Sequence, residues 1–523
     1  MNLNRALASV IRHHGRRAAV LDVAHSFTWE EFGNRVARLA GALAAQGVAR
    51  GARFAILSRN GFRVEELKWA GLRLGAIPVP VNFRLAPPEI AQIVADCGAV
   101  RVFVESAFAP LLEHPATAAW RGAAVVFGES AGADALAYEG MLAAAAPAPA
   151  ADPDPDADAL LLYTGGTTGR AKGVRLSHAN ILSNNVAFGL AVGARPEHVY
   201  LHAAPMFHSA DLLATGWFLQ GAAQCYLPMF SPQAFLEAIA RYRVGAVVTV
   251  PTMLIATVGS PEFARADVSS LKVLIYGAAP MALDWVAKVA QAFPHADFCN
   301  CYGLTETAPD LTIFNAREHR EAIEHMQATG ERGGRLLSVG KPNALNELKV
   351  VDDSGREVAA DVAGELLARG PNIMRGYHER PEETAAALKD GWLYTGDVAR
   401  IDEDGYVYLL DRKKDMVITG GENVYSSEVE AVLQRHPAVA EAAIIGAPDP
   451  RLGEKVVAAV VRRPAADVGP DELEAHCRTS LGGFKVPRRF MFVDALPKSA
   501  LGKVLKGELR RRAIEENTHG QPG

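Results

Sequence analysis

The sequence predicts an α/β fold with a large N-terminal domain of several subdomains and a small α+β domain at the C-terminus. Short apolar runs that end in Gly, Asn or Pro alternate with longer helical patterns through much of the first 400 residues. From Glu347 onward the pattern changes to β-rich segments with turn signals. A chain of 523 residues also exceeds what one hydrophobic core usually organises, so two or more domains are expected.

The N-terminal half begins with strand and helix patterns in alternation. Two segments, Trp29–Gly47 and Ala86–Gly98, have the apolar spacing of amphipathic helices. Strand–helix alternation predicts layered, largely parallel sheets covered by helices. Buried strands are predicted for four short apolar runs: Arg53–Ser58, Ile77–Asn82, Val100–Glu105 and Ala123–Gly128.

The middle of the chain contains a connection followed by further strands and helices. Residues Ala143–Ala159 are rich in Pro, Ala and Asp, which predicts a surface connection. A buried strand, LLLYT, follows directly. Ser231 and Pro232 predict the capped first turn of a helix, and AVVTVPT is the next predicted strand.

The C-terminal part has its own α+β pattern. Its predicted order is helix, strand, strand and helix, over Ser426–Pro437, Val439–Pro448, Glu454–Arg463 and Asp471–Gly482. We place the domain boundary near Asp411–Lys414, which gives an N-terminal domain of residues 1–411 and a C-terminal domain of residues 412–523.

Composition argues against several functional classes. The formal net charge is -5 and no long basic run occurs, so a nucleic-acid or anionic-membrane partner has no electrostatic support. Five scattered cysteines do not predict a disulfide framework. The first residues lack the apolar core of a signal peptide, and no run reaches the roughly 18 apolar residues of a spanning helix. We expect a cytoplasmic protein without a transmembrane segment.

The segment Leu160–Val174 carries the strongest chemical signal. A strand enters a loop of three glycines and three threonines that is closed by Lys172. Glycine lets backbone N–H groups approach an anion, threonine hydroxyls donate hydrogen bonds, and lysine adds a positive charge. The loop is a candidate triphosphate cradle, although it lacks the common G-x-x-x-x-G-K-[ST] pattern. The alternative, a flexible surface loop, fits such a composition after a buried strand poorly.

Three further segments are weak signals when each is taken alone. In Asn300–Asp310, Tyr302 offers a ring for a nucleobase and Glu306 a carboxylate for Mg²⁺, but a strand end with a capping threonine would look the same. Trp392–Glu430 holds Asp397 after a Thr-Gly turn, where an isolated Asp is usually a backbone cap. In Leu496–Lys506, Lys503 follows a glycine turn, and a lysine near a terminus is usually solvated.

Taken together and in this order, the four segments resemble the acyl-adenylate-forming (AMP-dependent synthetase/ligase) superfamily, and most of all its fatty-acyl-CoA and aryl-CoA synthetases. The resemblance covers nearly the whole chain. It implies ATP and Mg²⁺ as cofactors and coenzyme A as co-substrate. Gly165 and Ala171 depart from the usual Y-T-S-G-T-T-G-x-P-K-G loop, where serine and proline stand.

The resemblance assigns roles to individual residues of the nucleotide site. Glu306 and Thr164 would bind Mg²⁺, Thr305 would contact the α-phosphate, and Asp397 would accept hydrogen bonds from the ribose with Arg412 nearby. The phosphate-binding residues would be Thr164, Gly165, Gly166, Thr167, Thr168, Gly169 and Lys172, and those of the adenine pocket Gly277, Ala278, Ala279, Asn300, Cys301 and Tyr302.

The implied reaction has two steps. The substrate carboxylate attacks the α-phosphorus, assisted by Lys503, His208, Thr305 and Glu306, and pyrophosphate leaves. The C-terminal domain then rotates about the hinge Lys414, so we expect this domain to be mobile. Rotation would withdraw Lys503 and bring in the loop that lines the coenzyme A channel, Gly420, Gly421, Glu422 and Asn423. The sequence identifies no base for the thiol.

The segments that form the acyl pocket in this family carry no lysine or arginine here, which argues against a dicarboxylate. No aspartate is expected to be buried beside His208, which argues against an amino acid. Small Gly303 and Ala278 would leave depth for an apolar tail. The residues assigned to this pocket are His208, Trp217, Val250, Met253, Tyr276, Ala278 and Gly303.

The substrate class and the rival functions follow from these features. We expect an apolar monocarboxylate, with a medium- or long-chain fatty acid favoured over a cinnamate- or benzoate-type acid. Rivals are an adenylating enzyme that does not use coenzyme A and an inactive nucleotide-binding scaffold. Retention of Lys172, Glu306, Asp397, Arg412 and Lys503 argues against the scaffold. A homodimer is an open alternative to a monomer.

Overall fold

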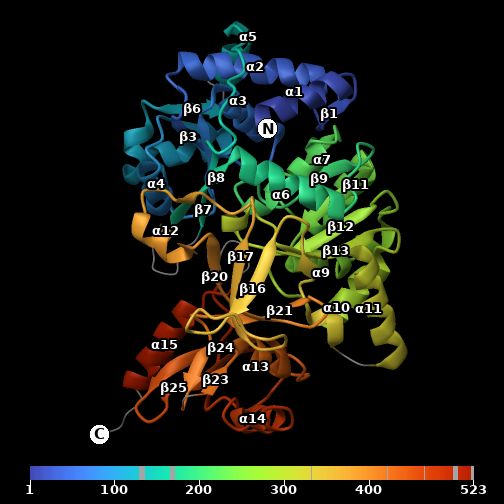
Figure 1. Ribbon diagram of the computed structural model, residues 1–523, viewed down its shortest axis with the longest axis vertical. Helices are drawn as coiled ribbons and strands as arrows, with labels where there is room; N and C mark the ends of the chain where they lie inside the picture. The colour runs from blue at the N-terminus through green and yellow to red at the C-terminus, as the bar shows by residue number, and fades with distance from the viewer. Residues whose placement is uncertain are drawn as a thin grey trace. The chain divides into compact units, whose positions relative to one another are not determined.

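The computed structural model describes residues 1–128, 136–164, 171–330, 333–420, 422–464, 466–498 and 504–519 (Figure 1). The chain forms two compact units. The first contains Met1–Leu348 and Ala368–Leu393, and the second contains Lys349–Leu367 and Tyr394–Gly523. This division falls earlier in the chain than the boundary predicted near Lys414, because the β-rich strands that precede Lys414 group with the C-terminal residues.

A nine-stranded sheet forms the centre of the first unit. Its order is β15-β14-β13-β12-β11-β9-β10-β1-β2, and the run from β13 to β1 is parallel. The carboxyl ends of parallel strands meet at one edge, so the last residues of β12 and β13 become neighbours. The strands are β1 (Ala18–Leu21), β2 (Ser26–Thr28), β9 (Val199–His202), β10 (Gln224–Tyr226), β11 (Val244–Thr249), β12 (Val273–Gly277), β13 (Asp297–Tyr302), β14 (Thr312–Phe314) and β15 (Lys341–Pro342).

A second, four-stranded parallel sheet confirms the strands predicted near the N-terminus. Its order is β4-β3-β5-β6, with β3 at Arg53–Leu57, β4 at Ile77–Pro80, β5 at Arg101–Glu105 and β6 at Ala124–Phe127. The predicted helices are confirmed as α2 (Trp29–Ala45) and α4 (Pro87–Asp96). Helix α2 begins at a capping box, in which Thr28 accepts from the Glu31 backbone N–H and the Glu31 carboxylate accepts from that of Thr28.

A three-stranded sheet carries the candidate phosphate loop. Its order is β18-β8-β7, with β7 at Asp158–Thr164, β8 at Lys172–Ser177 and β18 at Gly376–Tyr377. Residues 145–157 contain no helix or strand, which agrees with the predicted connection. The other α-helices described in this unit are α1 (Leu3–His14), α3 (Phe62–Leu74), α5 (Leu136–Ala144), α6 (His178–Ala191), α7 (Thr215–Phe218), α8 (Pro232–Tyr242), α9 (Pro251–Val258), α10 (Leu283–Ala292), α11 (Ala316–Thr329) and α12 (Pro381–Ala387).

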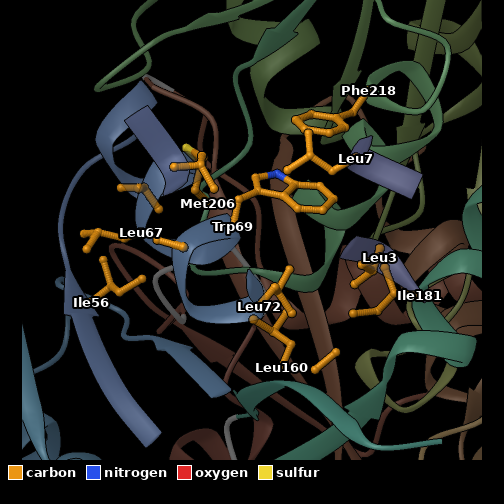
Figure 2. Packing of buried hydrophobic residues seen from close by; sticks show 14 of the residues in the cluster. Leu3, Leu7, Ile56, Leu67, Trp69, Leu72, Leu160, Ile181, Met206 and Phe218 are labelled. Carbon is orange, nitrogen blue, oxygen red and sulfur yellow. The ribbon is translucent and has the colours of Figure 1, made fainter. Parts of the chain in front are cut away.

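The main core of the first unit joins its N-terminal helices to the nine-stranded sheet region. Figure 2 shows the indole of Trp69 on α3 against Phe218 on α7, with Leu7 of α1 beside them. The rings of Trp69 and Phe218 stack with centroids 4.4 Å apart. Such aromatic contacts add to the stabilisation from burying apolar area.

The second unit contains a β-rich part and the predicted C-terminal α+β part. Strands β16 (Glu347–Val351), β17 (Gly364–Arg369) and β20 (Trp392–Ile401) each run across the division between the units, and β21 (Val407–Arg412) pairs with β20. In the first unit, β19 (Leu388–Lys389) pairs with the start of β20. The C-terminal elements are β22 (Val417–Thr419), β23 (Glu422–Val424), α13 (Ser426–Leu433), β24 (Val439–Asp449), β25 (Gly453–Arg462), α14 (Pro470–Arg478), β26 (Arg489–Phe492) and α15 (Lys506–His519).

Within the described residues, no helix has both the length and the apolar character that a membrane span requires.

A buried ion-pair network ties α2, α3 and α5 together. Glu66 is fully buried, and its carboxylate accepts from Arg35 and, at 3.0 Å, from the hydroxyl of Tyr138. The same guanidinium reaches Glu139 at 3.0 Å. Burial raises the pKa of Glu66 above its ordinary value, while Arg35 acts in the opposite direction. The carboxylate therefore depends on Arg35 for its compensating charge.

We predict that Arg35→Ala lowers the free energy of unfolding by about 3–5 kcal/mol, because it leaves Glu66 buried without its cation. Urea denaturation followed by circular dichroism measures the change. Arg38→Ala, an exposed arginine on the same helix, is the matched control and should cost no more than about 0.5 kcal/mol. Equal effects of the two substitutions would contradict the role given to the buried pair.

Candidate active site

The two ends of the candidate phosphate loop are held side by side. Thr164 ends β7, Lys172 begins β8, and the two residues pair across the antiparallel ladder. The predicted loop residues Gly165, Gly166, Thr167, Thr168 and Gly169 lie outside the described residues, and their role stays a prediction. The structure thus brings together the threonine and the lysine that the sequence assigned to one phosphate site.

The predicted adenine residues gather at the carboxyl edge of the nine-stranded sheet. Gly277 ends β12 and pairs with Cys301, next to Tyr302 at the end of β13. Ala278 is exposed and has a left-handed backbone (φ 65°), and Ala279 is exposed beside it. This edge therefore presents a strand end and an open turn to solvent, as a nucleobase site requires. Asn300 is buried and donates to the Tyr276 carbonyl at 3.3 Å.

The loop after β13 carries Thr305 and Glu306, and side-chain contacts fix both. The hydroxyl of Thr305 lies 3.1 Å from that of Ser209. One carboxylate oxygen of Glu306, Oε1, accepts from the hydroxyl of Tyr377 at 2.8 Å. Neither Ser209 nor Tyr377 stands in a sequence motif that predicts a role for it, and no local pattern links Tyr377 to a glutamate 71 positions earlier.

These residues are suited to hold a magnesium ion that a bound nucleotide would also coordinate. Glu306 is only partly buried, and among the described residues its Oε2 has no hydrogen-bond partner. No group of three or more His, Cys, Asp and Glu side chains in the described ranges could hold a metal alone. Mg²⁺ is commonly bound by one or two carboxylates together with substrate phosphates, so a single available carboxylate is sufficient.

Gly303 lies where two backbone segments approach closely. A Cβ atom at this position would lie 1.8 Å from the backbone oxygen of Pro309. A side chain at this position would therefore collide with the backbone, and the place of Gly303 in the acyl pocket stays a prediction. Glycine is required here because two backbone segments approach closely.

His208 lies at the N-terminal end of the short 3₁₀ segment Ser209–Ala214. Desolvation lowers the pKa of His208 to about 4, so its ring is neutral at pH 7. A neutral imidazole can donate one hydrogen bond to a carboxylate or phosphate oxygen without adding a full charge. This placement is consistent with the predicted position beside the reacting groups, which stays a prediction.

An aspartate is buried three residues from His208, contrary to the expectation. Asp211 is 3% exposed, and its carboxylate contacts Nδ1 of His202 at 2.5 Å and the ammonium of Lys68 at 3.3 Å. Burial alone would raise the pKa of Asp211, but His202 and Lys68 hold it below its ordinary value. Because this carboxylate is already paired, it is not available for a substrate amino group. An amino acid substrate therefore stays disfavoured, because the Asp211 carboxylate is paired rather than because an aspartate is absent.

Two predicted acyl-pocket residues lie on opposite faces of the nine-stranded sheet. Trp217 is fully buried in a core cluster that includes Ile275. Side chains alternate along a strand, so Tyr276 points the other way. Tyr276 stacks on Phe298 and its hydroxyl lies 3.1 Å from Nε2 of His319. Trp217 and Tyr276 therefore cannot line one common pocket wall.

The remaining predicted pocket residues lie near the carboxyl edge of the sheet. Val250 precedes the first turn of α9 and Met253 is buried within that helix, while Ala278 is exposed. Val250 and Met253 keep their assignment as predictions.

The second unit contains the predicted ribose site. Asp397 on β20 pairs with Arg412 at the end of β21, with the guanidinium Nε 2.6 Å from the carboxylate. The backbone N–H of Asp397 donates to the Thr395 hydroxyl at 3.1 Å. The structure places Arg412 beside Asp397, and a carboxylate oriented in this way can accept from a ribose diol. The ribose contact itself stays a prediction.

The predicted hinge and coenzyme A loop lie in the same unit. Lys414 is followed by Asp415, and mainly desolvation lowers the pKa of the Lys414 ammonium. Gly420 has a left-handed backbone (φ 60°), and Glu422 pairs with Thr419 across β22 and β23. Gly421 and Lys503 lie outside the described residues. The roles given to all of these residues stay predictions.

Comparison with known proteins accounts for both parts of the chain. Residues 7–378 match the model of the AMP-binding enzyme family, and residues 428–503 match that of the AMP-binding enzyme C-terminal domain. A feruloyl-CoA synthase from Amycolatopsis sp is 38% identical over 507 residues, which cover 97% of this chain and 96% of that protein. The fatty acid–[acyl-carrier-protein] ligase ScoC of Streptomyces coeruleorubidus is 34% identical, with 96% and 94% covered.

A solved structure agrees with the fold. The ATP-bound crystal structure of MatB from Rhodopseudomonas palustris superposes with a TM-score of 0.86 at 30% identity, covering 98% of this chain and 99% of that one. The AMP-binding family model spans the segments that carry Lys172 and Glu306. This chain therefore belongs to the AMP-binding enzyme family and is an AMP-forming acid–thiol ligase.

Proposed function

We propose that this enzyme activates an apolar monocarboxylic acid with ATP and then transfers the acyl group to coenzyme A. The observation that carries the proposal is the convergence of Lys172 and Glu306 on one region of the first unit, where both approach Tyr377. A lysine for phosphate oxygens and a carboxylate for the accompanying metal are the two charges that a bound triphosphate needs. The relatives named as coenzyme A ligases support the choice of acceptor.

The chemistry of the first step is largely electrostatic. An oxygen of the substrate carboxylate attacks the α-phosphorus, the bond to the bridging oxygen breaks, and pyrophosphate leaves. Two anions must meet, so the task of the protein is to position them and spread their charge. Lys172 and the predicted Lys503 would contribute positive charge, and Thr305 would donate to the α-phosphate. Mg²⁺, held by Glu306 and Thr164, would supply further charge neutralisation when bound.

In the second step the coenzyme A sulfur attacks the acyl carbon and AMP leaves. The thiol must lose its proton, because the thiolate is the effective nucleophile. We propose that Lys414 is the hinge that exchanges Lys503 for the loop around Gly420 and Glu422 between the two steps. The cytoplasmic location and a homodimeric state also remain predictions.

For the acid, we propose an aromatic propenoate as the first candidate and a medium- or long-chain fatty acid as the second. The first is supported by the 38% identity to a feruloyl-CoA synthase across nearly the whole chain. The second, favoured by the sequence analysis, is supported by ScoC and by the long-chain-fatty-acid–CoA ligase FadD13 of Mycobacterium tuberculosis, which is 32% identical.

We predict that ferulate or a fatty acid, together with ATP and coenzyme A, yields acyl-CoA, AMP and pyrophosphate in equal amounts. The measurement is kcat/KM across ferulate, benzoate, octanoate, palmitate and malonate, with products identified by mass spectrometry. Malonate should be at least about a hundredfold poorer, because its second carboxylate would be buried without a counter-ion. Pyrophosphate without thioester would exclude coenzyme A as acceptor, and no pyrophosphate with any acid would refute the proposal.

We predict that Lys503→Ala lowers adenylation by about 10²–10³-fold, because it removes a charge that stabilises the transition state. The rate of thioester formation from supplied acyl-AMP should change by less than about threefold. Pyrophosphate release and acyl-CoA formation are measured separately. The control is Lys498→Ala, a lysine in the same segment that pairs with Glu441. Equal loss in both half-reactions would contradict the proposed exchange.

A further inference from the structure

The segment Met374–His378 joins the strand that carries Lys172 to the loop that carries Glu306. The N–H of Met374 donates to the Glu306 carbonyl at 2.8 Å, and the N–H of His378 donates to the Gly173 carbonyl at 2.7 Å. Between these two bonds lies β18, which pairs with β8. One short segment therefore fixes the backbone on both sides of the predicted phosphate and metal site.

The side chain of Tyr377 lies between the two charged groups. Its hydroxyl donates to Oε1 of Glu306 at 2.8 Å. The ammonium of Lys172 is 5.0 Å from the centroid of its ring, which is a cation–π distance. The tyrosine thus gives each charge a partner of moderate strength, one through its hydroxyl and one through its ring.

Lys172 and Glu306 do not pair with each other. The described residues include both side chains, and no ion pair within 4.0 Å links them. A direct pair between them would occupy the carboxylate oxygens that a metal needs and the N–H groups that phosphates need. Both groups would then have to separate before a nucleotide could bind.

We propose that Tyr377 is a positioning residue that keeps Lys172 and Glu306 apart and separately oriented. The hydroxyl fixes Oε1 of Glu306 and leaves Oε2 available for Mg²⁺. The ring holds the Lys172 ammonium at a site from which it can move to the phosphates. The inference rests on the proposed function, because it takes Glu306 as the metal ligand and Lys172 as the phosphate contact.

The test compares ATP binding by Tyr377→Phe and by the unmodified enzyme, without acid, over a series of Mg²⁺ concentrations. Isothermal titration calorimetry gives the Kd at each concentration and in EDTA. The variant keeps the ring and loses the hydroxyl. It should need about tenfold more Mg²⁺ for the same ATP affinity, since a charge-assisted hydrogen bond to the ligand carboxylate is lost. In EDTA the Kd values of the two proteins for ATP should agree within about twofold, because the Lys172 ammonium still contacts the aromatic ring at position 377.

Two further variants separate this role from a general loss of stability. Tyr138→Phe removes another tyrosine hydroxyl that donates to a glutamate, Glu66, at 3.0 Å, and should keep the Mg²⁺ dependence of the unmodified enzyme. In a Glu306→Gln background, Tyr377→Phe should change the Mg²⁺ dependence by less than about twofold, because the group through which it acts is gone.

The inference is overturned if Tyr377→Phe and the unmodified enzyme show the same Mg²⁺ dependence, or if Tyr138→Phe shifts it equally. Failure of the proposed function would look different. In that case the unmodified enzyme would bind no ATP at any Mg²⁺ concentration and would release no pyrophosphate with any acid, and the inference would be refuted with it.

Discussion

The parallel pairing of β12 with β13 is the constraint on which the candidate site in the first unit depends. It places Gly277 beside Cys301 and brings the strand ends to a common edge. After β13, Gly303 lies so close to the backbone of Pro309 that a side chain would not fit there. This close approach sets the position of the next residues, Thr305 and Glu306. A hydrogen bond from the Thr305 hydroxyl to Ser209 and one from the Met374 N–H to the Glu306 carbonyl complete the support.

In the first unit, the kind of partner that a charged side chain has depends on how deeply that side chain is buried. Deep in the unit, Glu66 and Asp211 are paired with arginine, lysine or histidine and serve the fold. Near the candidate site, Lys172 and Glu306 are partly buried and each contacts tyrosine, a neutral partner. Buried ions need strong partners to offset desolvation, whereas groups that must accept a ligand need partners that leave binding capacity free. The difference separates structural charges from those suited to binding.

The sequence predicted elements and local neighbours well because their signals are local. Apolar periodicity located β3, β5 and α2, and a strand followed by a Gly/Thr loop located Thr164 and Lys172. It did not show that Gly303 lies against the backbone of Pro309, because a sequence shows the size of a residue but not what lies beside it. The sequence did not show that Trp217 and Tyr276 lie on opposite faces of the sheet, or that Asp211 is paired. Both facts follow from packing between distant segments. The contact of Tyr377 with Glu306 is of the same long-range kind.

The central claim is that Thr164, Lys172 and Glu306 surround one bound triphosphate and its metal. A crystal structure with ATP and Mg²⁺ tests it most directly. The account predicts the Lys172 ammonium within hydrogen-bond distance of a β- or γ-phosphate oxygen and a Glu306 oxygen about 2.1 Å from Mg²⁺ or linked to it by one water. A nucleotide bound elsewhere, with both side chains still on Tyr377 and away from any phosphate, would contradict it.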